Sequence, residues 1–110
     1  DDMEKSIELS TCVVNSFEKK LNVSTAAMTD AGYLKVGCLP TKTKGVYCRN
    51  LQLTRYIHTP LVYGETLYQD NIDELKALGA KTDKTKNERV QQVAEAYFLG
   101  ILNYVQTKKQ

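Results

Sequence analysis

Apolar residues recur at helical spacing near both ends of the chain. From about Met3 to Leu21 they fall on one broad face, which predicts an amphipathic helix. A second helix is predicted from about Glu88 to Gln106, and its expected buried stripe consists of Val90, Val93, Ala94, Tyr97, Ile101, Tyr104 and Val105. Leu99 points away from this stripe, and Gly100 lies at its edge. A helical glycine costs about 0.5–1 kcal/mol against alanine, so Gly100 predicts a close approach to a sheet.

The middle of the chain has a different pattern. Residues 23–45 are rich in turn residues and predict a long loop or insertion, in which YLKVGCLP is either a short strand or an ordered loop. Val46–Tyr56 alternates and predicts a strand. Pro60–Tyr68 predicts a second strand, and its consecutive Leu61-Val62-Tyr63 is typical of a strand covered on both faces in a parallel α/β sheet.

A short helix is expected after the second strand, at IDELKAL. Asp70 or Asn71 can cap its start, and Gly79 can end it. The following segment, KTDKTKN, predicts a solvated loop. The chain therefore reads as an α/β protein with two or three strands, two long helices and one short helix.

Composition narrows the possible functions only slightly. The 110 residues are 42% hydrophobic and 25% charged, as in an ordinary globular domain. The net charge of +2 is too weak to indicate nucleic-acid binding, and no apolar run is long enough to predict a membrane span. Cys12, Cys38 and Cys48 are odd in number and match no zinc motif, so at least one thiol is expected to be free.

Glu65 is the most informative single residue, because it stands at the end of an apolar run. Burying an unpaired carboxylate costs several kcal/mol, so a glutamate there is either solvated or functional. Arg55 can pair with a carboxylate or contact an anionic substrate, or it is a plain surface arginine. The single histidine, His58, precedes the predicted strand and is expected in a turn roughly 20 Å from Glu65.

Five pieces of the sequence, in order, resemble the later part of the zinc-dependent N-acetylmuramoyl-L-alanine amidases. These are cell-wall hydrolases of bacterial autolysins and phage endolysins. The matching residues are Ser6 with Leu9 to Leu21, then Leu51-Gln52-Leu53-Thr54-Arg55, then Pro60 with Glu65, then Tyr68 with Asp70 and Asn71, and last Ala94, Ala96, Gly100, Ile101 and Tyr104. The resemblance covers nearly the whole chain apart from Val23–Lys44.

The resemblance implies that residues 1–110 are the later, C-terminal part of one amidase-like catalytic domain. Its fold would be part of a three-layer α/β/α domain with a mostly parallel sheet. Glu65 would be the catalytic glutamate beside a zinc ion, and Arg55 a substrate-binding residue. The reaction would cleave the amide between N-acetylmuramic acid and L-alanine of the stem peptide in peptidoglycan. The protein would then be secreted, associated with the cell wall, or a phage lysin.

The chain departs from the family in its zinc ligands. The family's His, Glu and His motifs do not occur here, so no metal ligand is expected in this chain, and the ligands would come from sequence preceding Asp1. That segment is an expected partner, as a covalent or a separate chain. The alternative is a non-enzymatic α/β binding or assembly module that lacks the zinc site.

Overall fold

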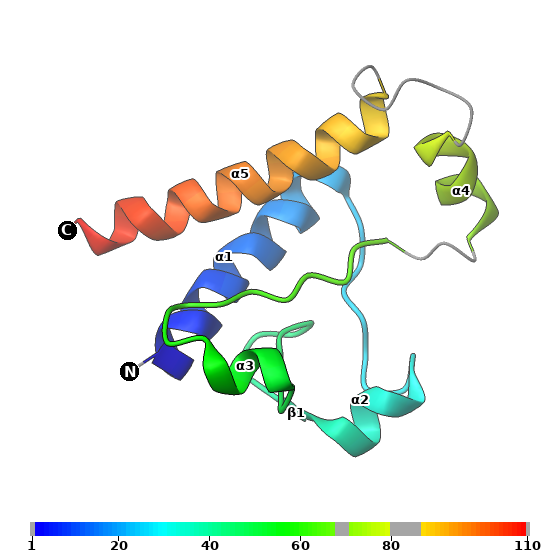
Figure 1. Ribbon diagram of the computed structural model, residues 1–110. Coiled ribbons are helices and arrows are strands. Elements are labelled where there is room, and N and C mark those ends of the chain that lie inside the picture. The colour runs from blue at the N-terminus through cyan, green and yellow to red at the C-terminus, as the bar shows by residue number, and fades with distance from the viewer. Residues whose placement is uncertain (1, 68–70, 80–86, 110) are drawn as a thin grey trace.

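The protein is mostly helical in the computed structural model, which describes residues 2–67, 71–79 and 87–109 (Figure 1). In chain order its elements are α1 (Asp2–Leu21), α2 (Gly32–Gly37), β1 (Cys38–Pro40), β2 (Tyr47–Arg49), α3 (Gln52–Tyr56), α4 (Ile72–Leu78) and α5 (Glu88–Lys108). Tyr68, Asp70 and all but the last residue of the predicted KTDKTKN loop lie outside the described residues.

The predicted ends of the helices are confirmed by local chemistry. Asn22 adopts the left-handed conformation with φ of 53° and ends α1. Asn71 accepts the backbone N–H of Glu74 at 3.1 Å and begins α4, and Gly79 with φ of 55° ends that helix. Asn87 caps α5 in the same way as Asn71 caps α4, by accepting the N–H of Val90 at 2.9 Å.

The most extensive packing between elements is the crossing of α1 and α5, where small residues allow the two backbones to touch (Figure 1). Leu34, Cys38 and Val46 are buried outside this crossing, on α2 and in the hairpin segment. A Cβ atom on Gly100 would lie 2.6 Å from the Cα atom of Val13, so only glycine fits. Ala96, one turn earlier, is fully buried, and its carbonyl accepts the hydroxyl of Ser16 at 2.7 Å. The predicted close approach at Gly100 is therefore confirmed, although its partner is a helix and not a sheet.

The predicted buried stripe of α5 is partly wrong, because the close contact at Gly100 decides which side of the helix faces α1. Ala96 and Gly100 occupy the buried centre, with half-buried Val93, Tyr97 and Tyr104 beside them. Leu99, which was expected to be exposed, is half-buried. Ala94, Ile101 and Val105, which were expected inside, are exposed, and Phe98 and Leu102 are exposed as well.

The predicted fold class is wrong. The described residues contain one sheet, in which β1 and β2 pair antiparallel with Cys38 opposite Arg49 and Leu39 opposite Cys48. Only Tyr47–Arg49 of the predicted Val46–Tyr56 strand is a strand, and Gln52–Tyr56 forms α3. The Thr54 hydroxyl accepts the N–H of Leu51 at 2.9 Å, so the local chain satisfies its own backbone without a neighbouring strand. There is no parallel sheet in the described part of the chain and thus no three-layer α/β/α arrangement.

The second predicted strand is an extended segment that lies against helices. The N–H of Leu61 donates to the hydroxyl of Ser6 on α1 at 2.9 Å, and Thr66 shares a hydrogen bond with the hydroxyl of Tyr97 on α5. Tyr63 is exposed, so the expected coverage of Leu61-Val62-Tyr63 on both faces is wrong. The Ser6 hydroxyl thus accepts a backbone N–H that a sheet neighbour would otherwise accept. Residues 23–45 contain α2 and β1 besides their loops.

The substitution Gly100→Ala should destabilise the protein. Its new methyl group meets the backbone of Val13, so the two helices must separate, and overpacking of this kind costs about 1–3 kcal/mol. Urea unfolding followed by circular dichroism measures the loss. The matched control is Gly32→Ala, whose Cβ atom meets nothing within 4 Å. Equal stability of both variants would contradict the close crossing.

Candidate functional site

Glu65 lies at the centre of a polar cluster that joins three segments of the chain. Its carboxylate accepts the hydroxyl hydrogen of Tyr33 on α2, and Arg49 at the end of β2 places Nη1 3.6 Å from the Glu65 Oε1 atom. The guanidinium carbon of Arg49 also lies 4.9 Å from the centre of the Tyr33 ring. We call Tyr33, Arg49 and Glu65 the tyrosine–arginine–glutamate cluster.

Each member of this cluster is positioned by a different element. Tyr33 lies one residue into α2, and Arg49 is opposite Cys38, the residue that directly follows α2. The β1–β2 pairing therefore brings the Arg49 side chain beside Tyr33. Glu65 is placed by the extended segment, which is tied to α1 and α5 by its hydrogen bonds to Ser6 and Tyr97.

Gly64 fixes the position of Glu65 further. A Cβ atom on Gly64 would overlap the hydroxyl group of Tyr97, so a larger residue there would force the Tyr97 side chain or the segment to move. The Tyr97 ring is itself held by an edge-to-face contact with Phe17, at 4.8 Å between ring centres and 79° between planes. The α1–α5 crossing therefore determines where Glu65 stands.

The cluster changes the pKa of Tyr33. The hydrogen bond to Glu65 raises the pKa of Tyr33 to about 12, with smaller contributions from burial and from the negative charge of Glu65. The phenol therefore remains a donor throughout the physiological pH range. A donor hydrogen bond and an ion pair occupy the Glu65 carboxylate, although about half of its side chain (51%) is exposed. These polar contacts hold α2, the hairpin and the extended segment together.

Arg55 is not part of this cluster. It is exposed on α3, and no hydrogen bond or ion pair joins it to Glu65 among the described residues. The arginine that pairs with Glu65 is Arg49, and the expected substrate-binding role of Arg55 stays a prediction. Sequence reasoning missed both Arg49 and Tyr33, because the contact between Tyr33 and Glu65 spans 32 residues and has no local signal.

The described residues do not fit a zinc ion. No three His, Cys, Asp or Glu side chains in ranges 2–67, 71–79 and 87–109 gather as a metal-binding group. His58 is exposed between α3 and the extended segment. Cys38 and Cys48 belong to adjacent pairs of the hairpin and so face opposite sides, and all three cysteines are free. Burial and the charge of Glu8 raise the pKa of the Cys12 thiol, which disfavours the nucleophilic thiolate.

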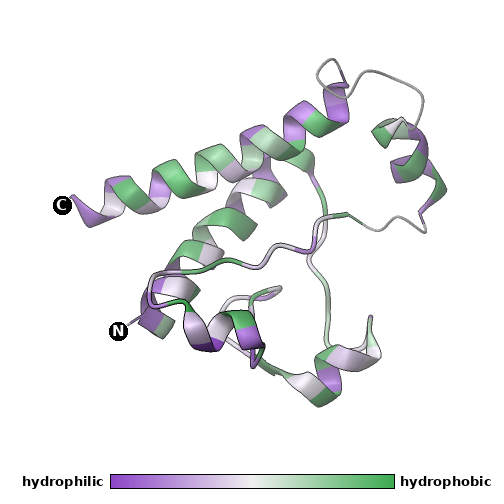
Figure 2. Cartoon of the chain, in the orientation of Figure 1, coloured by the Kyte–Doolittle hydropathy of each residue, from purple (hydrophilic) through white to green (hydrophobic). Residues whose placement is uncertain are grey.

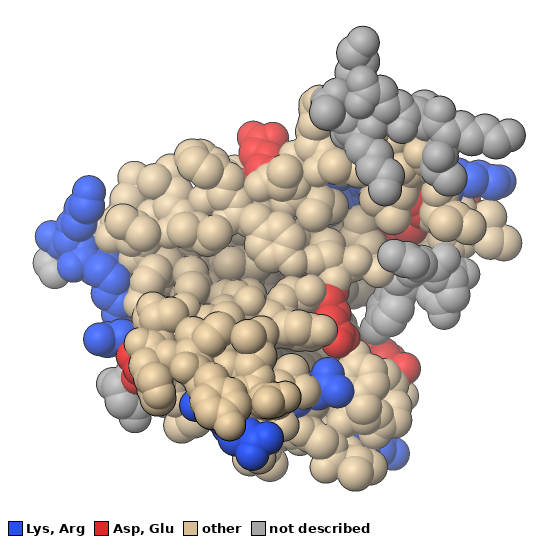
Figure 3. Space-filling model, in the orientation of Figure 1, with Lys and Arg blue, Asp and Glu red and all other residues tan. Residues whose placement is uncertain are grey.

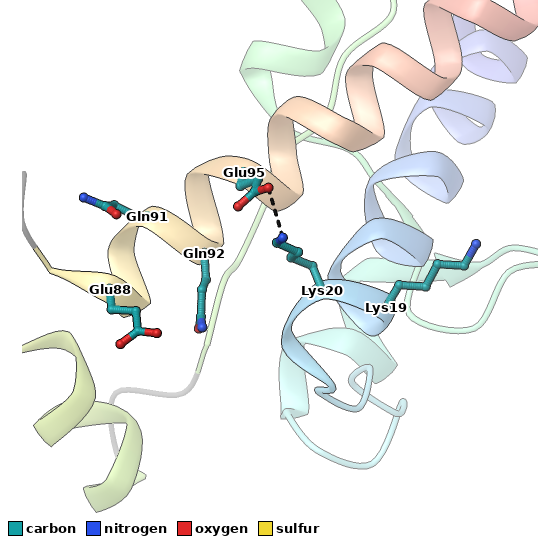
Figure 4. A pocket seen from close by; sticks show the side chains of 6 residues that line it. All are labelled: Lys19, Lys20, Glu88, Gln91, Gln92 and Glu95. Carbon is teal, nitrogen blue, oxygen red and sulfur yellow. Dashed lines mark ion pairs between the residues drawn. The ribbon is translucent and has the colours of Figure 1, made fainter.

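A shallow polar groove lies where the end of α1 meets the start of α5 (Figure 4). Lys20 pairs with Glu95 across it at 2.9 Å, and Lys19 is directed away from the acidic side chains. The remaining lining is Glu88, Gln91 and Gln92. Lysines, glutamates and glutamines in an open groove provide mixed charges without a convergent binding chemistry, so this groove is a weak candidate for a ligand site.

The outer face of α5 is an exposed apolar surface. We use this name for Phe98, Ile101, Leu102 and Val105, which recur at helical spacing and are 62%, 49%, 36% and 42% exposed. Figure 2 shows apolar residues recurring along α5, and Figure 3 shows a largely uncharged surface over the helix, with basic side chains near its C-terminal end. In the described part of the chain α5 packs mainly against α1 and, near its start, against α4.

Comparisons of the chain with models of protein families, with curated proteins and with solved structures found no match. The fold itself is a crossed helix pair with an antiparallel hairpin. No helix of the described residues is long and apolar enough to cross a membrane.

Removal of the Glu65 carboxylate should return Tyr33 to an ordinary phenol. In Glu65→Gln we expect the pKa of Tyr33 to fall from about 12 toward its usual value of 10.0, because its strongest interaction is lost. A raised folded-state pKa stabilises the protein below the unfolded pKa, and this stabilisation is lost as the pH rises through about 12. Phenolate absorbance in each background, minus that of its Tyr33→Phe variant, isolates this tyrosine. An unchanged titration in Glu65→Gln would contradict the hydrogen bond between Tyr33 and Glu65.

Proposed function

We propose that the chain is a non-enzymatic protein-assembly module, and that the outer face of α5 is its interaction surface. The observation that carries this proposal is the distribution of side-chain sizes around α5. The helix turns Ala96 and Gly100 inward and turns Phe98, Ile101 and Leu102 toward solvent. A surface helix of a monomer normally does the reverse, since its large apolar side chains are most stable in the core.

The clustering of these residues supports the same proposal. Single exposed apolar residues are ordinary, but a continuous apolar stripe on one helix is typical of a protein interaction surface. Aromatic residues such as Phe98 are enriched at the centres of such interfaces. The tyrosine–arginine–glutamate cluster then has a structural part in the module, because it connects the hairpin, α2 and the extended segment.

Peptidoglycan hydrolysis stays a prediction of the sequence resemblance. The exposed half of the Glu65 side chain is the observation in its favour. The donor set among the described residues does not fit zinc. Clearance of cell walls by the chain, lost in Glu65→Gln and retained in Glu18→Gln on the exposed side of α1, would establish the hydrolase and overturn the non-enzymatic proposal.

Site-specific photo-cross-linking tests the assembly function. We expect p-benzoylphenylalanine placed at Phe98 to give discrete protein adducts in an extract of the source organism, because an interaction surface brings a partner within reach of the ring. The matched control carries the same amino acid at Ile72 on α4, which is 66% exposed and lies outside the stripe. Electrophoresis and mass spectrometry identify the adducts. Equal labelling from both positions, or none from Phe98, would show that the outer face of α5 is not an interaction surface.

A further inference from the structure

The outer face of α5 has the same pattern read from either end. Ile101 and Leu102 flank its midpoint, and Phe98 and Val105 stand at equal distances from that midpoint. When two such helices lie antiparallel, Phe98 of one copy meets Val105 of the other, and Ile101 meets Leu102. A two-fold interface pairs residue i with j and j with i, so this pattern places apolar side chains against apolar side chains along the whole contact.

The charges of α5 favour the antiparallel direction. Glu88 and Glu95 lie in its first half, and Lys108 and Lys109 lie at its end. An antiparallel pair brings Lys109 of one copy close to Glu95 of the other, where Glu95 also pairs with Lys20 of its own copy, and it opposes the two helix dipoles. A parallel pair instead places glutamate beside glutamate and lysine beside lysine.

We propose that the outer face of α5 binds a second copy of this chain, with the two α5 helices antiparallel and the two-fold axis between Ile101 and Leu102. This inference rests on the proposed assembly function and names its partner. Large side chains from both copies become buried in the pairing, while the Ala96–Gly100 face remains in contact with α1. The existing fold needs no rearrangement to form the dimer.

The size of the stripe sets the expected strength of the dimer. A standard stable interface buries about 800 Å² on each partner, and four partly exposed side chains supply less than this. Glu95 and Lys109 at the margins add polar contacts whose contribution is small because they are exposed. We therefore expect a reversible dimer with a dissociation constant on the order of micromolar.

Sedimentation equilibrium over a range of protein concentrations tests the partner. The apparent mass should rise from 12.4 kDa toward twice that value as the concentration passes the micromolar range. Ile101→Glu should weaken the association at least about tenfold, because it places a carboxylate on the axis. Ile72→Glu is the control, because Ile72 is an exposed isoleucine on α4 (66%, against 49% for Ile101), and it should leave association unchanged. Circular dichroism confirms that both variants remain folded.

Oxidative cross-linking tests the direction of the helices. In the antiparallel pair, Leu102→Cys lies beside its own equivalent, whereas two Val105→Cys residues are separated by about 10 Å along the axis. Leu102→Cys should therefore form the covalent dimer much faster than Val105→Cys, with the unsubstituted chain reporting the contribution of the three native thiols. The charge reversals Glu95→Lys and Lys109→Glu should each weaken the dimer, and the double variant should recover it.

Each failure has a different meaning. If the wild-type chain is still monomeric at about 100 μM, the second-copy inference is overturned. The assembly function still holds if the Phe98 probe then cross-links a different protein, and it fails with the inference if the probe cross-links nothing. Equal cross-linking of Leu102→Cys and Val105→Cys overturns the antiparallel arrangement. Binding of the monomer to phosphatidylglycerol vesicles, abolished by Ile101→Glu, would make the face a lipid surface and overturn both proposals.

Discussion

The contact between Gly100 and the backbone of Val13 is the constraint on which the rest of the structure depends. It brings the α1 and α5 backbones together and allows Ser16 to donate its buried hydrogen bond to the carbonyl of Ala96. The close approach of the two backbones leaves room only for small residues at the crossing. The bulky side chains of α5 therefore lie on its flanks and its far side. The position of Tyr97 against Phe17 follows from this arrangement.

The same constraint reaches the candidate site through Tyr97. Its hydroxyl group bonds Thr66 and lies against Gly64, and the next residue along the chain from Gly64 is Glu65. The carboxylate thereby stands where Tyr33 and Arg49 can reach it, and its charge is compensated at the surface by a phenol and a guanidinium. The position of Glu65 after an apolar run therefore has a structural explanation, because its carboxylate connects the extended segment to the hairpin and α2.

Features that depend on neighbouring residues could be predicted from the sequence. The two long helices follow from their apolar period, and α4 follows from Asn71 and Gly79 at its ends. The apolar run Leu61-Val62-Tyr63 was misleading, since three such residues suit a buried strand or a segment lying on helices. Similarly, the buried face of α5 is set by backbone contact at Gly100, whereas the apolar pattern alone favoured the larger side chains. The cluster around Glu65 depends on contacts between segments 16 and 32 residues apart, which one sequence does not reveal.

Native-state hydrogen exchange, measured by NMR on the isolated chain, tests the central claim that the α1–α5 crossing holds the structure together. We expect amides around Val13 and Gly100 to exchange slowest, with the same free energy of opening, because the two helices can lose their contact only together. Amides of α3 and of residues 61–67 should open at lower free energies. If the amides of α5 open far more readily than those of α1, or if the β1–β2 hairpin is the most protected part of the chain, the crossing does not organise the fold.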